Sequence, residues 1–411
     1  MNSPTPEALA AVDRIAQALE IPPPAGIASP SGPGRAWPQA LADGAAGIAL
    51  LHIERARSGQ GSWRTAHAWV SAAVADEVTA AANAGLFLGA PALAFVMHAA
   101  ADANRYRHAL AMLDDAMLTV SRARLAAANR RIDAAIRPAI REYDLVRGLA
   151  GLGACHLRCQ PSHEVTRDVL AYLVRFTEPL SPSDDFPPWW TDTSPNGEPD
   201  PRYAEGHGNL GVSHGIGAVL AVLSLAMISG IRVPGVEEAI GRICAWTDQW
   251  RQDEADGTWW PGFITAVQVH AGIADSAPRP RPSWCYGVAG MARAQQLAAL
   301  ALKDRDRQQA AEQAMAAVLH DSVQLASLDG PGLCHGTAGL LQAAWRMAAD
   351  AHAPQIAAEI PALAATLIEQ VSDPAIGPWL MDGAAGAALA LNTAGTGTEP
   401  ASTWDAFLAL S

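Results

Sequence analysis

Residues 287–290 read Gly-Val-Ala-Gly, and an apolar stretch with helical spacing follows them directly. The same opening of small residues occurs seven times in the 411-residue chain, beginning at Gly44, Gly89, Gly148, Gly215, Gly287, Gly336 and Gly383. At least one further helical stretch separates each copy from the next, so one repeat is a helical hairpin. Hairpins of this size need neighbours to cover their apolar faces. The repeats therefore predict an all-α protein.

Seven hairpins can stack as an open solenoid or close into a ring. Two features favour the ring. The helix openings are small and apolar in every copy, and neither terminal copy has the polar face that caps a solenoid. Glycine and alanine one turn apart also let neighbouring helices approach closely. We therefore predict a closed ring of helical hairpins.

The chain outside the repeats divides simply. A helix is expected over residues 6–19, and the Pro- and Gly-rich chain that follows, to residue 38, is interpreted as a linker or an arm. The sequence is thus divided into an N-terminal arm, residues 1–40, and a single helical domain, residues 41–411. The second helices of the repeats include those expected at residues 65–82, 121–136, 236–250 and 308–325.

Two long loop insertions are expected, near residues 178–210 and 253–283. Each contains a double tryptophan, Trp189-Trp190 in the first and Trp259-Trp260 in the second. Long loops inside a compact domain are commonly functional, as lids or as walls of a binding site. An anchoring role for the indole rings fits the sequence equally well.

The composition excludes several classes of protein. A formal net charge of −13 argues against nucleic-acid binding, which normally requires a basic face. No secretory signal is visible, and the longest apolar run, residues 216–228, is too short to span a bilayer. Five cysteines without close spacing do not suggest a disulfide framework. A reducing, cytoplasmic location is therefore expected, with association with a membrane complex left open.

Ligand-type side chains recur at one position of the repeat, just before its first glycine. Cys285 precedes Gly287 by two residues, and Cys334 and His335 immediately precede Gly336. Thiolates and imidazoles are the ligands that zinc prefers, and three protein ligands leave a fourth position open. Alternatively, the cysteines are small buried hydrophobes and His335 is a surface histidine. The shared position in the repeat favours zinc.

Other polar residues near the same position suggest proton chemistry. His214 directly precedes Gly215 and is the natural acid or base. Asp144 lies four residues before Gly148, and it is expected to orient His214 or to accept a proton. Arg281 could stabilise developing negative charge, although a solvated surface arginine is more common.

The remaining candidates are interpreted as structural. Asp43 and Asp382 directly precede repeat glycines and are expected to be helix N-caps. The segment Cys155-His156-Leu157-Arg158-Cys159 looks like a metal motif but lies in a repeat helix, so its cysteines are expected in the core. His207 stands out of phase with the repeat and is not assigned a role.

Three motifs together resemble the lanthionine synthetase C-like (LanC) family. They are Ser213-His214-Gly215, Trp284-Cys285-Tyr286-Gly287 and Cys334-His335-Gly336, in this order on seven helical repeats. The resemblance covers residues 44–389. It implies an α/α toroid, or α/α barrel, with an inner and an outer ring of seven helices each and a zinc ion at one end.

The resemblance also implies roles for single residues. Cys285, Cys334 and His335 match the family's zinc ligands, His214 and Asp144 its acid/base pair, and Arg281 and Tyr286 active-site positions beside the metal. There are departures from the family pattern: Ser213 replaces an alanine, Arg281 stands between two prolines, and Pro91 lies within the second repeat's opening. None of them changes a zinc ligand.

The activity implied is that of a zinc-dependent lanthionine synthetase, with one zinc ion per chain. Such a lanthipeptide cyclase adds peptide cysteine thiols to dehydroalanine or dehydrobutyrine, which forms the thioether rings of a lantibiotic-type peptide. With no large dehydratase region, the chain is expected to be a free-standing cyclase that receives a leader-bearing precursor peptide from a separate dehydratase. Two alternatives remain: addition of glutathione or another thiol to dehydrated residues, and a non-catalytic helical scaffold that binds peptide. An α/α glycosidase barrel would instead require paired carboxylates.

Overall fold

The computed structural model describes residues 5–23, 38–102, 105–181, 184–274 and 278–411. Residues 24–37, which make up most of the Pro- and Gly-rich segment of the expected N-terminal arm, lie outside the described residues. Two compact units emerge from the contacts within the chain. The first unit comprises the chain up to Val120, Leu328–Phe407 and Ser411, and the second comprises Ser121–Ser327 and Leu408–Leu410. Each unit is described by itself below.

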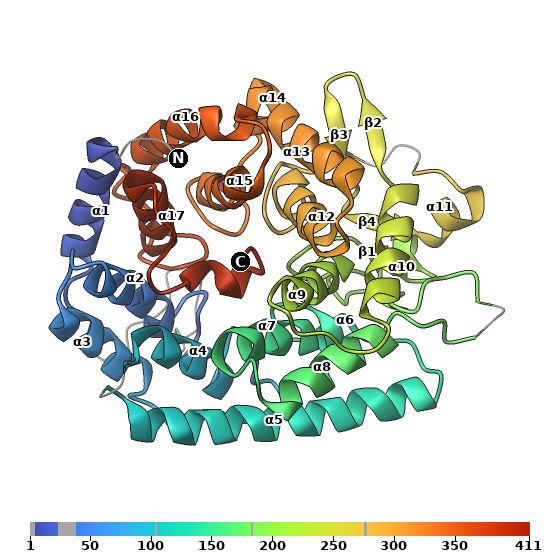
Figure 1. The fold of residues 1–411 in the computed structure, drawn as a ribbon, viewed down its shortest axis with the longest axis horizontal. Coiled ribbons are helices and arrows are strands. Elements are labelled where there is room, and N and C mark those ends of the chain that lie inside the picture. Colours follow the sequence, from blue (N-terminus) through green and yellow to red (C-terminus); the bar gives the residue numbers. More distant parts are fainter. Residues whose placement is uncertain (1–4, 24–37, 103–104, 182–183, 275–277) are drawn as a thin grey trace. The chain divides into compact units, whose positions relative to one another are not determined.

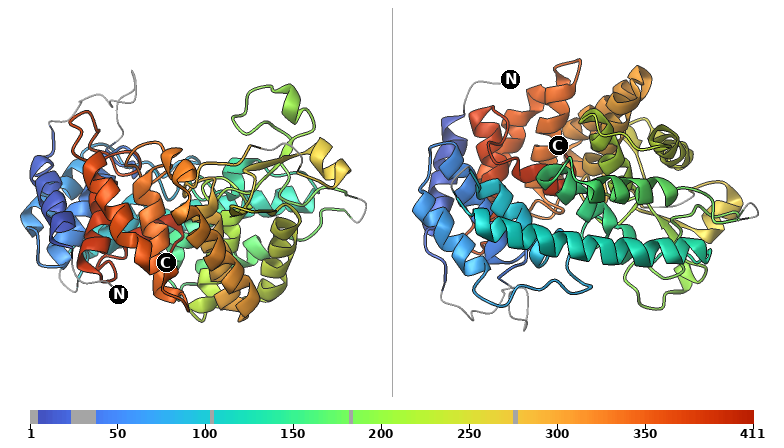
Figure 2. Two further views of the ribbon diagram at one scale, coloured as in Figure 1. Left: turned by 90° about the horizontal axis from the view of Figure 1, so that it is seen from above. Right: turned by 60° about the horizontal axis from the view of Figure 1, so that its bottom comes forward.

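The described residues of the first unit form helices, isolated bridges and loops (Figure 1). Its helices are α1 (Pro6–Ala18), α2 (Ala45–Arg57), α3 (Trp63–Ala73), α4 (Ala90–Ala100), α15 (Thr337–Asp350), α16 (Gln355–Gln370) and α17 (Ala384–Thr396). A 3₁₀ helix, Trp404–Leu408, follows α17. The 27-residue helix α5 (Arg107–Asp133), seen along its whole length in Figure 2, contributes residues to both units.

In its described residues, the second unit combines helices with four short strands. Its helices are α6 (Ile140–Tyr143), α7 (Leu149–Cys159), α8 (Glu164–Arg175), α9 (Ile216–Ile228), α10 (Val236–Gln249), α11 (Ala266–Ala271), α12 (Val288–Leu302), α13 (Arg305–His320) and α14 (Ser322–Ala326). The strands are β1 (His207–Asn209), β2 (Gln252–Glu254), β3 (Gly257–Trp259) and β4 (Phe263–Thr265), and a 3₁₀ helix spans Pro201–Tyr203.

The helices that begin at the repeat glycines form the core of each unit. In the first unit α2 packs against α4 and α17, and α17 packs against α15; in the second, α9 packs against α7 and α12. These helices are apolar on nearly all sides, as α9 shows most clearly, whereas α8 and α10 each bury one apolar stripe. Within the described part of the chain, no helix has the length and apolarity that crossing a bilayer requires.

Close backbone approach explains why the repeat opening needs glycine. A Cβ atom on Gly287 would lie 2.1 Å from the carbonyl oxygen of Arg281, and one on Gly383 would lie 2.3 Å from that of Gly377. Both contacts reach back six residues, because 287 − 281 and 383 − 377 both equal six. The N-terminal turn of each helix therefore folds tightly onto the loop before it.

The expected aspartate caps are wrong. The N-cap residues of α2 and α17 are the glycines Gly44 and Gly383, and neither helix has a side-chain cap. Asp43 and Asp382 each lie one residue before the N-cap, because the tight turn places the glycine at the N-cap position. Asp382 lies instead near His335.

Several expected helix boundaries are corrected by the structure. The helix expected at 65–82 ends at Ala73. The chain after it is bonded instead to the start of α4, where the carbonyl of Thr79 accepts a hydrogen bond from Ala90 N at 2.9 Å. The helix expected at 308–325 is interrupted at Asp321, whose carboxylate caps a new helix, α14. The helix expected at 121–136 begins fourteen residues earlier (121 − 107), as α5. The helices expected at 6–19 and 236–250 are confirmed within a residue.

The two loop insertions meet in a small antiparallel sheet, in which β1 from the first pairs with β4 from the second. Their tryptophans are buried: Trp189, Trp190, Trp259 and Trp260 are each at most 6% exposed. The indole of Trp190 donates a hydrogen bond to the carbonyl of Glu205 at 2.8 Å, and its ring stacks on Phe186. Of the two interpretations of these tryptophans, the structure supports anchoring.

Candidate functional site

His214 lies in the turn that leads into α9, and a buried carboxylate holds its ring. Asp144, at the end of α6, accepts a hydrogen bond from His214 Nδ1 at 2.6 Å. Asp144 is 1% exposed, whereas the His214 side chain is 35% exposed. The other carboxylate oxygen accepts from the amide of Arg147 at 2.7 Å. Since Nδ1 donates its hydrogen to the carboxylate, Nε2 is the nitrogen left to accept or release a proton on the open side.

Tyr286 lies beside this pair. Its ring centroid is 6.5 Å from that of His214 and 5.0 Å from that of Phe263 in β4. The phenol oxygen accepts a hydrogen bond from the side-chain amide of Asn209 at 3.1 Å. Burial raises the pKa of Tyr286 well above its usual range, so the phenol stays protonated in neutral solution. The second unit therefore brings together three of the predicted catalytic residues.

Cys285 lies in the turn that leads into α12. It is 8% exposed, and its sulfur lies 3.4 Å from the hydroxyl of Ser283. The neighbouring Trp284 donates its indole hydrogen to the carbonyl of Leu408 at 2.9 Å, which fixes the turn. The backbone carbonyl of Cys285 accepts from Val212 N at 2.9 Å, so the turns before α9 and α12 are joined directly.

Arg281 is placed differently from the other predicted catalytic residues. Its side chain is exposed, and its backbone carbonyl accepts from Ser283 N at 2.7 Å, which shapes the loop before Cys285. A charge-stabilising role for Arg281 stays a prediction.

Cys334 and His335 lie in the first unit, in the turn before α15. The carbonyl of Met381 accepts hydrogen bonds from the amides of Leu333 and Cys334, at 2.6 and 3.1 Å. His335 Nε2 lies 3.7 Å from Asp382 Oδ1 and 3.9 Å from an oxygen of Asp329. These two carboxylates place negative charge beside the imidazole, which is favourable for a bound cation.

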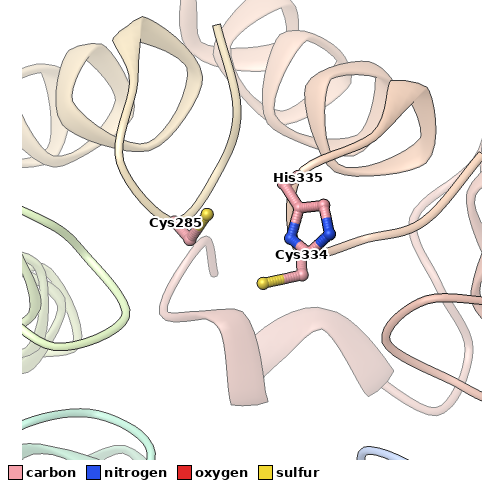
Figure 3. A group of neighbouring side chains, drawn as sticks. All are labelled: Cys285, Cys334 and His335. Carbon is pink, nitrogen blue, oxygen red and sulfur yellow. The ribbon is translucent and has the colours of Figure 1, made fainter. Parts of the chain in front are cut away.

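The three predicted metal ligands form one group of donor atoms. Figure 3 draws Cys285, Cys334 and His335, and one candidate ligand atom from each lies within 4.8 Å of the others. Two thiols and one imidazole match the chemistry of a zinc site with one position open. The donor set present in this chain therefore fits zinc.

The remaining cysteines and His207 are structural. Cys155 is buried as predicted, and Cys244 is buried as well. The core position expected for Cys159 is wrong, because this residue ends α7 and is only partly buried. Burial raises the pKa of the Cys244 thiol to about 11. The ring of His207 is fully buried, Nδ1 donates to the carbonyl of Thr193 at 2.7 Å, and burial lowers its pKa to about 4.

Sequence reasoning missed two polar residues that support the site, Asn209 and Ser283. A signal for Asn209 was present: it precedes Gly215 by six residues, the spacing at which Gly287, Gly336 and Gly383 each pack against a backbone carbonyl. No comparable signal marks Ser283, because its hydroxyl matters only through its contact with Cys285.

The protein is an all-α protein whose core helices begin at the repeat glycines. The turns before these helices carry the thiols and imidazoles of a candidate zinc and acid/base site. The model of the family described as "Lanthionine synthetase C-like protein" matches residues 35–409, so the chain belongs to this family. Among curated proteins, none matches the chain by sequence.

Among solved structures, the fold is similar to that of a protein named nisin cyclase. The TM-score is 0.78 at 16% sequence identity, and the match covers 98% of this chain and 97% of that one. At this identity the likeness concerns the fold alone, and it confirms the predicted all-α toroid class.

Proposed function

We propose that the chain is a zinc-dependent lanthipeptide cyclase, which adds cysteine thiols to dehydroalanine or dehydrobutyrine within one peptide. Family membership supports the reaction class. The observation that carries the proposal is the buried Asp144 carboxylate, 2.6 Å from His214, in a turn that is hydrogen-bonded to the turn of Cys285. A peptide-binding scaffold has no need of such an oriented imidazole.

Cys285, Cys334 and His335 would hold the zinc ion, one per chain. When bound, zinc supplies a Lewis acid that favours the thiolate form of a substrate cysteine at neutral pH. Two cysteine ligands leave the metal less electron-poor than histidines would, which preserves the nucleophilicity of sulfur. The half-exposed imidazole of His335, near Asp329 and Asp382, completes the set.

The proton chemistry falls to His214. As the carbon–sulfur bond forms at the β-carbon of the dehydrated residue, the electron pair of the double bond moves towards the α-carbon and the adjacent carbonyl oxygen. His214 delivers a proton from Nε2 to the α-carbon, and Asp144 stabilises the imidazolium and holds the ring. Arg281 and Tyr286 are proposed to interact with the negatively charged oxygen. The thiol proton is lost and one proton is gained, so the peptide's mass does not change.

The proposed reaction also leads to proposals for the partner enzyme, the location and the domain organisation. A separate dehydratase must supply the dehydrated, leader-bearing peptide, because this reaction consumes a carbon–carbon double bond that it cannot make. Free cysteine thiols in the substrate fit a reducing, cytoplasmic setting. We also propose that residues 41–411 function as a single domain, with residues 1–40 as its arm.

Metal analysis tests the ligand set. We expect about one zinc per wild-type chain and loss of the metal in Cys334→Ser. Cys244→Ser is the matched control, because Cys244 is buried against Gln295 and should leave the zinc content unchanged. A folded wild-type protein that is purified without chelator and contains no zinc would contradict the proposal.

A synthetic peptide with one dehydroalanine and one cysteine tests the reaction. The enzyme should abolish alkylation of the peptide thiol by iodoacetamide without changing the peptide's mass. Added glutathione distinguishes the alternative activity, since intermolecular addition increases the mass by one glutathione. If a zinc-loaded protein forms neither the cyclised peptide nor the glutathione adduct, that result would favour the non-catalytic scaffold.

A further inference from the structure

Asn209 closes strand β1 and is 1% exposed, and the reaction as outlined above does not use it. Its carboxamide joins two backbone turns. Oδ1 accepts a hydrogen bond from Gly211 N at 2.9 Å, in the turn that carries His214. Nδ2 donates to the phenol oxygen of Tyr286 at 3.1 Å, in the turn that carries Cys285. An amide group can hold both turns because it presents an acceptor and a donor at opposite atoms.

The backbone around Asn209 leaves little room for another arrangement. A Cβ atom on Gly215 would lie 2.3 Å from Asn209 Oδ1, so the side chain fills the space beneath the start of α9. The register of β1 and β4 places Asn209 opposite Phe263, whose ring packs on Tyr286. A Cβ atom on Gly211 would lie 2.6 Å from the Tyr286 ring. The ring is therefore confined by backbone on one side and by Phe263 on another.

We propose that Asn209 is a positioning residue of the thioether-forming site, which holds the Tyr286 phenol and the His214 turn in a fixed relation. The inference rests on the proposed function. Because Asn209 Nδ2 donates to the phenol oxygen, the phenol must direct its own hydrogen to a different acceptor. In the reaction that acceptor is the substrate carbonyl oxygen next to the α-carbon, where negative charge develops as sulfur adds.

Asn209→Ser separates the two contacts. A serine hydroxyl at this position can still accept from Gly211 N in a similar turn, but it is too short to reach Tyr286. We expect kcat for the dehydroalanine peptide to fall about tenfold while KM stays within about twofold. Asn129→Ser is the matched control, since Asn129 bonds Leu125 and Arg175 on α5 and α8, and it should retain wild-type kcat.

The double variant shows whether Asn209 acts through Tyr286. In the Tyr286→Phe background the phenol oxygen is absent, so Asn209→Ser should have no further effect on kcat. A general structural defect would instead slow both backgrounds by the same factor, and that result would overturn the inference.

A measurement without substrate tests the contact itself. The chain has five tyrosines, so ¹⁹F spectra of protein labelled with 3-fluorotyrosine are simple, and Tyr286→Phe identifies the resonance of Tyr286. Asn209→Ser should move that resonance and leave the other four in place. An unmoved Tyr286 resonance would overturn the inference. A wild-type protein that shows the contact but forms no thioether would instead count against the proposed function.

Discussion

The Asp144–His214 contact is the single interaction on which the proposed proton transfer depends most. Asp144→Asn keeps the size of the side chain but removes the charge that stabilises an imidazolium. We expect kcat for thioether formation to fall by about two to four orders of magnitude with the fold retained. Peptide alkylation assays measure the rate, and circular dichroism reports on the fold.

A second histidine–aspartate pair provides the control. In the first unit His98 Nε2 lies 2.9 Å from Asp114 Oδ1, and no reaction step is assigned to it. Asp114→Asn should therefore leave kcat unchanged. Equal losses in both variants would show that removing any such charge damages the enzyme, and the specific role of Asp144 would be wrong.

Thiol reactivity separates the structural Cys244 from the candidate ligands. Burial raises the pKa of Cys244 to about 11, so in the folded protein its thiol stays protonated at neutral and mildly alkaline pH. We expect iodoacetamide to leave Cys244 unmodified at pH 8 while it alkylates the metal-free Cys334. Mass spectrometry of peptides identifies the sites. Rapid alkylation of Cys244 in the folded chain would contradict its assignment to the core.

At the scale of the element, the repeat glycines hold each helix opening against its own loop. A Cβ atom on Gly290, in α12, would lie 2.0 Å from the carbonyl oxygen of Trp284. Gly290→Ala should therefore lower the free energy of unfolding by about 2–3 kcal/mol. It should also displace the turn of Cys285 and weaken zinc binding.

Gly241 offers the matched control within a helix of the same unit. It lies in α10, and a Cβ atom there would meet no other atom within 4 Å. Gly241→Ala should raise the free energy of unfolding by about 0.5–1 kcal/mol, since alanine loses less backbone entropy in a helix. Thermal melts of the two variants should move in opposite directions. Melts that move together would refute the close-packing explanation.

At the scale of the whole molecule, buried neutral histidines predict sensitivity to acid. Burial lowers the pKa of His52, in the first unit, and of His207, in the second, from 6.5 to about 4. Because the folded-state pKa is the lower one, the stabilisation is present above pH 6.5 and is lost as the pH falls towards 4. Each histidine accounts for about 3 kcal/mol of this loss.

Replacement of a buried histidine should flatten this acid dependence. We expect the unfolding free energy of His207→Gln to change less between pH 6.5 and pH 4 than that of the wild type. The exposed His320 provides the control, and His320→Gln should retain the wild-type slope. Urea titrations at several pH values measure the slope. An unchanged slope in His207→Gln would mean that His207 is not the group that titrates.

Sequence periodicity was sufficient to predict the fold class. A repeat glycine followed by an apolar helix occurs seven times, and this local pattern is what the packing of helical hairpins requires. Helix ends were less predictable. Residues 74–82 have helical composition, yet the chain there supports α4 through Thr79, a contact that periodicity cannot reveal. Likewise, Asp43 before an apolar helix predicts an N-cap, but in the structure Gly44 is the N-cap residue of α2.

The sequence by itself determined which residue types recur before the helices, and hence the candidate ligands and the acid/base histidine. Only the tertiary structure decided how these groups are held: Asp144 meets His214 across 70 residues of chain, and Asn209 meets Tyr286 across 77. The physical reason is that a side chain's type and repeat position are local properties of the sequence. Its hydrogen-bond partners, by contrast, are set by the packing of distant turns.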